Sequence, residues 1–145
     1  MTLGAAARLY TPELLGLAVE LADYPLDAGF PWQGEAVSRT CGSTLAIGFD
    51  RAADGTVARL GMRVSACAVG QAAAAIFARE GVGSDETAIV EAGRAVEAWL
   101  AGGTPPAWPG IELLGPARAH AARHGAILLP WRAAANALSK PARRD

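Results

Sequence analysis

Two alternating segments joined by one turn limit most strongly what this chain can fold into. Over 45–50 and again over 59–64, apolar residues alternate with small or polar ones. A period of two is typical of a strand that buries one face. Asp54 and Gly55 lie between the segments and favour a hairpin turn. With a short polar edge strand over 34–40, the sequence predicts a small antiparallel sheet of about three strands.

Segments with helical signals come both before and after these strands in the sequence. Thr11 and Pro12 suit the start of a first helix, and the alanine-rich segment after the last strand favours another. The predicted helices run from Thr11 to about Asp23, from Cys67 to Glu80, from a cap at Ser84 or Asp85 to Gly102, within Ile111–Arg123, and from Pro130 to Leu138. This order predicts an α+β fold with the helices packed against the sheet.

The length and charge of the chain exclude several classes of protein. We expect 145 residues to form a single domain, with its core over about 10–138. The net charge is −1 and the basic residues are scattered, so we expect no nucleic-acid partner. The longest weakly polar stretch, Val64–Ala78, is too short to span a membrane. Residues 1–10 lack the apolar region of a secretory signal, and we therefore expect a cytoplasmic protein.

Two cysteines are the main candidates for chemistry. Cys41 lies in a predicted turn, beside a glycine that would present its thiol. Cys67 lies where a strand gives way to a helix, and a helix N-terminus stabilises a thiolate. Buried packing explains Cys67 equally well. The spacing leaves a disulfide, a metal site and two unrelated thiols open, although a cytoplasmic setting disfavours the disulfide.

The other candidate side chains carry weaker signals. His120 and His124 would share one face of a helix, as a metal pair does, but an exposed polar face explains them as well. Trp131 is expected to fill the core. No base stands at a recognisable spacing from Cys67, so the sequence does not predict an enzyme. A thiol-based metal site and no site at all remain the alternatives.

Three segments, read together, resemble one known family. Cys41-Gly42-Ser43 is followed by SACAVGQA at 65–72 and by RHGAILLPW at 123–131. This order resembles the NifU-like (IscU/SufU-type) iron-sulfur cluster assembly scaffolds over nearly the whole chain. Their pattern is a Cys-Gly-Asp turn, a Gly-Cys-Ala segment heading an Ala/Ser-rich helix, and a Cys-Ala-Leu-Leu-Pro-Trp ending. The resemblance implies the SufE/NifU (IscU-like) fold.

The resemblance also implies a site. Cys41 and Cys67 match two of the three cysteines with which the family assembles a cluster or holds zinc. The family's aspartate falls on Ser43, and its third cysteine falls on Ala126. Two ligands are therefore replaced. Because His124 comes two positions before Ala126, in a predicted loop, we consider it as a substitute metal ligand, with Ser43 as a further oxygen ligand.

Two functions of different class follow from the resemblance. In the first, the chain is a scaffold or carrier that binds iron, zinc or a transient Fe-S cluster through Cys41 and Cys67. Its partners would be a cysteine desulfurase or other cluster-assembly proteins. In the second, it is a metal-free relative that serves as a protein-binding module in cluster assembly. The LPPVK-type segment that engages a co-chaperone in some members is absent from this sequence.

Overall fold

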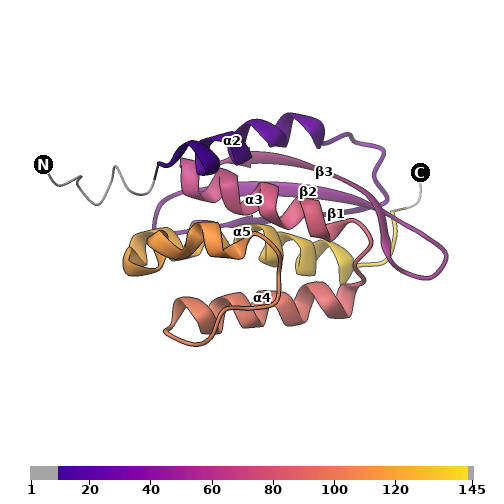
Figure 1. Ribbon diagram of the computed structural model, residues 1–145. Helices are drawn as coiled ribbons and strands as arrows, with labels where there is room; N and C mark the ends of the chain where they lie inside the picture. Colours follow the sequence, from indigo (N-terminus) through magenta and orange to yellow (C-terminus); the bar gives the residue numbers. More distant parts are fainter. Residues whose placement is uncertain (1–9, 144–145) are drawn as a thin grey trace, which may run out of the picture.

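A three-stranded antiparallel sheet in the order β1-β2-β3 is the centre of the computed structural model, which describes residues 10–143 (Figure 1). Helices precede and follow the sheet, so the predicted α+β fold is confirmed. The elements, in chain order, are α2 (Pro12–Glu20), η1 (Leu21–Asp23), β1 (Trp32–Val37), β2 (Thr44–Arg51), β3 (Val57–Ser65), α3 (Ala68–Gly81), α4 (Glu86–Leu100), η2 (Ile111–Ala119) and α5 (Ala121–Leu138).

Local sequence explains where several of these elements begin and turn. Thr11 caps α2, since its Oγ1 accepts a hydrogen bond from a backbone N–H of the first turn. Asp85 caps α4 in the same way. The hairpin between β2 and β3 turns at Asp54 and Gly55, and Gly55 has a φ of +89°. A residue with a side chain rarely adopts that conformation, so the glycine fits this turn.

The core lies between the sheet and two helices. Helices α3 and α5 pack against the strands, α2 packs on α3, and α4 packs on α5. Figure 1 shows α2, α3, α5 and α4 following one another from top to bottom of the view. The alanines at 72–75 and 78 of α3 are buried, which lets this helix lie close to its neighbours. Trp131 is a core residue as predicted, and its ring meets Phe77 and Trp108 edge-on.

The last part of the chain differs from the prediction. One helix, α5, runs through Pro130 instead of starting there. A proline inside a helix costs a backbone hydrogen bond. Here Pro130 is buried in the core, and the residues before it in α5 include strong helix formers such as Ala126, Leu128 and Leu129. The helix predicted within 111–123 is a 3₁₀ helix that ends at Ala119.

The edge strand also has different bounds. It covers Trp32–Val37 rather than 34–40, because the chain turns back at Ser38. The N–H of Gly42 donates to the carbonyl of Ser38, and the N–H of Ser38 donates to the carbonyl of Ser43. These bonds close the turn that carries Cys41.

Within residues 10–143, no helix has both the length and the apolar character that a membrane crossing requires. The prediction that the N-terminus is no secretory signal falls on residues 1–9, which lie outside the described part of the chain, and on Tyr10.

Candidate functional site

The turn between β1 and β2 presents Cys41 to solvent. The turn spans 38–43 and is closed by two backbone hydrogen bonds of 2.8 Å between its ends. Gly42 has a φ of +72°, a conformation that residues with side chains rarely adopt. Cys41 itself is exposed. The glycine next to the cysteine therefore has the role that the sequence predicted for it.

Two buried hydroxyls hold the Cys41 thiol. Its Sγ lies 3.4 Å from Oγ of Ser38 and 3.0 Å from Oγ of Ser43. Both serines are almost fully buried, with exposed fractions of 4% and 5%. Hydrogen bonding with Ser38 and then with Ser43 lowers the pKa of Cys41 below its ordinary value, and the positive charge of Arg123 contributes in the same direction. The turn therefore favours the thiolate form of Cys41.

Cys67 stands at the N-terminus of α3. It is the N-cap residue, and its side chain makes no capping hydrogen bond. The residue is half-buried. The strand register places it at the same end of the sheet as Cys41, because Thr44 pairs with Val37 on one side and with Ser65 on the other. The two cysteines predicted from sequence thus lie at one end of the sheet.

Helix α5 brings the fourth family position to this end. A Cβ atom at Gly125 would overlap Oγ of Ser38, so the helix here passes directly over the Cys41 turn. A Cβ atom at Gly70, in the first turn of α3, would lie 3.2 Å from Cβ of Ala126. Ala126 is fully buried. The positions that match the family's ligands therefore gather here, but two of them carry no thiolate or carboxylate.

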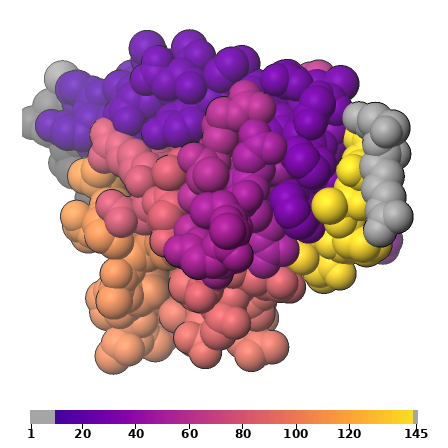
Figure 2. All heavy atoms as spheres, turned by 90° about the vertical axis from the view of Figure 1, so that its right-hand side faces the viewer, coloured from indigo at the N-terminus to yellow at the C-terminus, as the bar shows by residue number. Residues whose placement is uncertain are grey.

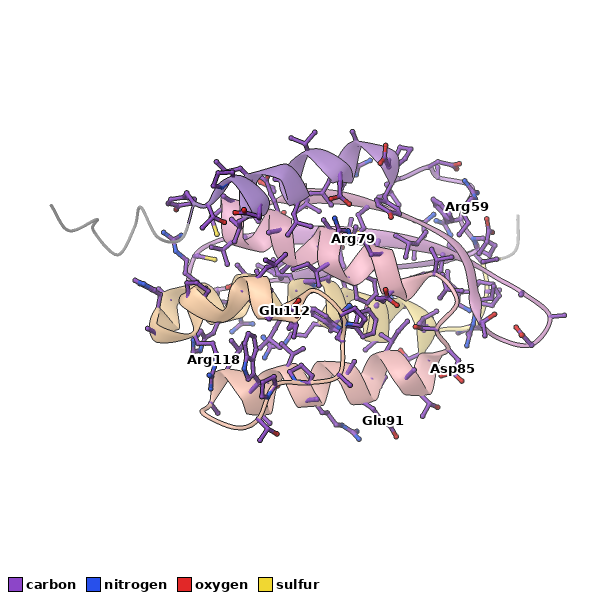
Figure 3. All side chains as sticks on the ribbon, viewed as in Figure 1. Arg59, Arg79, Asp85, Glu91, Glu112 and Arg118 are labelled. Atoms are coloured by element: carbon purple, nitrogen blue, oxygen red, sulfur yellow. The ribbon has the colours of Figure 1, made fainter. Side chains whose placement is uncertain are left out.

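The histidines are placed differently from the prediction. His124 lies within α5 and not in a loop. Its Nε2 is 2.7 Å from the carbonyl oxygen of Arg118, and because a carbonyl only accepts, Nε2 is the donor. Arg118 is in turn fixed by hydrogen bonds to the carbonyl of Trp99 at the end of α4 (Figure 3). His120 is the residue before α5, so the two histidines do not form a pair along one helix face.

The described residues around Cys41 and Cys67 offer too few side-chain ligands to complete a metal site within this one chain. Across residues 10–143, no three His, Cys, Asp or Glu side chains come together in a way that could hold a metal ion. Sequence reasoning missed Ser38 and Arg123, which act on Cys41 from outside its motif. No sequence signal pointed to them, because the fold alone brings them to the thiol.

Comparisons with known proteins agree with this architecture. No protein-family model matches the chain, and no curated protein matches its sequence. Among solved structures, a NifU-like protein (N-terminal) from Brucella abortus superposes with a TM-score of 0.84 at 26% identity, over 94% of this chain and 96% of that chain. A putative iron-sulfur cluster assembly scaffold protein for the SUF system from Fervidobacterium islandicum has a TM-score of 0.78 at 16% identity, over 90% and 96%.

A third solved structure, of a hypothetical protein, superposes with a TM-score of 0.66 at 13% identity, over 88% of this chain and 98% of that chain. It shares the fold and adds no function. The first two structures are a NifU-like protein and a SUF scaffold, the kinds of protein that the three sequence segments resemble. The superposition covers almost the full length of each. The chain therefore has the fold of these NifU-like and SUF scaffold structures, which supports the resemblance of its sequence to the NifU-like (IscU/SufU-type) family.

Proposed function

We propose that this chain is a scaffold-like protein of iron-sulfur cluster assembly, which binds iron, zinc or a transient cluster through Cys41 and Cys67. The single observation that carries the proposal is that both cysteines lie at the same end of the sheet, with Cys41 exposed. The Brucella abortus NifU-like protein and the Fervidobacterium islandicum SUF scaffold have the same fold. The proposed role is binding and transfer rather than catalysis.

The two thiolates are not enough to hold such a cargo alone. Zinc in structural sites and a [2Fe–2S] cluster each take four protein ligands. Ser43 offers a neutral hydroxyl that is already 3.0 Å from the Cys41 sulfur, and Ala126 offers no ligand. The missing ligands therefore come from a second molecule. A cysteine desulfurase, whose persulfide sulfur could reach the exposed Cys41, is the partner that we propose.

The second candidate function is that of a metal-free binding module in cluster assembly. A specific observation favours it, because Ala126 at the family's third cysteine position is fully buried. Within the described chain, no group of three metal-ligating side chains replaces the lost ligands. Cys41 and Cys67 would then be a redox thiol and a packing residue.

Metal and sulfide analysis after anaerobic purification distinguishes the two functions. Wild type is compared with a Cys41→Ala, Cys67→Ala double variant, and Thr40→Ala serves as the control, because it changes an exposed neighbour in the same turn. Each protein is analysed alone and after incubation with a persulfide-bearing desulfurase, iron and sulfide. Visible absorption reports a bound cluster.

The scaffold role predicts little metal in the chain alone. It predicts stoichiometric iron with sulfide, or zinc, when the desulfurase is present, in wild type and Thr40→Ala but not in the double variant. If wild type and the double variant bind equally little metal in every mixture, the scaffold role is wrong. Binding of the desulfurase without metal would then support the module.

A further inference from the structure

A cavity of about 430 Å³ opens where the segment after α5 meets the sheet, and neither cysteine lines it. Its lining includes Gln33 and Glu35 of β1, Ala46 of β2, Arg63 of β3, and Lys140 and Arg143 from the segment after α5. Figure 2 shows the end of the described chain, in yellow, lying beside the violet residues of the first part of the sheet. The volume suits a small molecule rather than a single ion.

The strand register explains why the sheet is hollow here. Glu35, Ala46 and Arg63 pair across the three strands and form one row. Side chains in such a row point to the same face of a sheet. The middle position is an alanine, so the row is low at its centre and has a charged side chain at each side. This row forms the floor of the cavity.

Two contacts hold the segment after α5 beside this row. A Cβ atom at Gly34 would lie 2.6 Å from the backbone nitrogen of Ala137, so only glycine lets the end of α5 come this close to β1. Beyond the helix, the N–H of Arg143 donates to the carbonyl oxygen of Pro31 over 2.7 Å. The backbone of 140–143 is therefore fixed along the start of β1, where it completes the cavity wall.

The charges of the lining are unbalanced. Arg63, Lys140 and Arg143 contribute three positive charges and Glu35 one negative charge, which gives +2 for the lining (3 − 1). The whole chain has a net charge of −1. Among residues 10–143, none of these four side chains takes part in an ion pair, whereas Arg51, Arg59, Arg79 and Arg132 all do. The cations of the cavity are thus available to a ligand.

We propose that this cavity binds a small anionic ligand with at least two negative charges, of the phosphate or polycarboxylate class. A guanidinium group can bind either group with two parallel hydrogen bonds, and an ammonium group adds a point charge. Because the cationic side chains are exposed, binding is of moderate strength and weakens as salt is added. This site is separate from the cysteines and does not depend on their function.

Isothermal titration calorimetry on the full chain tests the proposal, with pyrophosphate and citrate as the probes. The variants are Arg63→Gln and Lys140→Gln, and Arg94→Gln is the matched control, because Arg94 is an exposed arginine on α4 outside the cavity. We expect one site with a Kd below about 1 mM at low salt for at least one probe. Each cavity variant should weaken binding about fivefold or more, and the control less than twofold.

The two probes identify the ligand class, since the tighter one shows whether phosphate or carboxylate is preferred. An acidic peptide, such as a hexaglutamate, is titrated in parallel. No measurable binding of either small probe overturns the proposal, as does an equal loss in all three variants. Binding of the peptide more than about tenfold tighter than both probes, with the same dependence on Arg63, would assign the surface to a protein segment and also overturn it.

Discussion

Replacing Gly125 with alanine tests the packing of α5 on the cysteine turn. Inside a helix this change normally stabilises by about 1 kcal/mol. Here the new Cβ would overlap Oγ of Ser38 and lie 3.2 Å from its Cβ. The hydroxyl must turn away from Cys41, and a buried hydroxyl without its partner costs about 1–3 kcal/mol. With some overpacking added, we expect a net loss of about 1–2 kcal/mol.

Chemical and thermal denaturation followed by tryptophan fluorescence measures this loss. For a chain of this size it corresponds to a decrease in Tm of about 3–6 °C. The matched background is Ser38→Ala, in which no hydroxyl opposes the new methyl group. There Gly125→Ala should be neutral or stabilising, so the double-mutant cycle should give a coupling free energy of about 2 kcal/mol. If Gly125→Ala stabilises the wild type, the packing described for Ser38 is wrong.

Three further changes test other parts of the structure. The fold lowers the pKa of the Cys41 thiol relative to the unfolded chain. The thiolate therefore stabilises the fold at pH values above the pKa of the unfolded chain, and this stabilisation is lost as the pH falls through the pKa of the folded protein. Alkylation rates against pH should therefore have a lower midpoint in wild type than in Ser43→Ala, and equal midpoints would contradict the role of the hydroxyl. Asp85→Ala removes the cap of α4 and should lower the free energy of unfolding, measured in urea, by about 1 kcal/mol. Asp85→Asn should keep most of that stability, because its side-chain oxygen can still accept the capping hydrogen bond. Gly61→Ala should cost about 2 kcal/mol or more, because its Cβ would overlap the carbonyl oxygen of Pro25; an unchanged Tm would refute this contact.

Most of the fold could be predicted because its signals are local. The alternation around Asp54 and Gly55 reports the hairpin, since each side chain of a strand points to a fixed face. The caps at Thr11 and Asp85 act within one helical turn. The start of α5 could not be predicted in this way. Burial of Pro130 in the core outweighs its local preference for a helix start, and that burial is a property of the whole fold.

The candidate site was predictable only in part. Cys41 and Cys67 stand in recognisable motifs, and the strand register brings them to the same end of the sheet. Ser38 and Arg123 have no motif of their own, and tertiary packing brings them to the thiol. The sequence predicted His124 in a loop, but it lies within α5, where Gly125 leaves room for Oγ of Ser38.

X-ray absorption at the iron or zinc edge tests the central claim most directly. The sample is the protein loaded anaerobically in the presence of the desulfurase, as wild type and as the Cys41→Ala, Cys67→Ala double variant. We predict sulfur scatterers at about 2.3 Å from the metal in wild type, and no metal bound above background in the double variant. A wild-type metal surrounded only by nitrogen and oxygen, or a sulfur shell unchanged in the double variant, would contradict it.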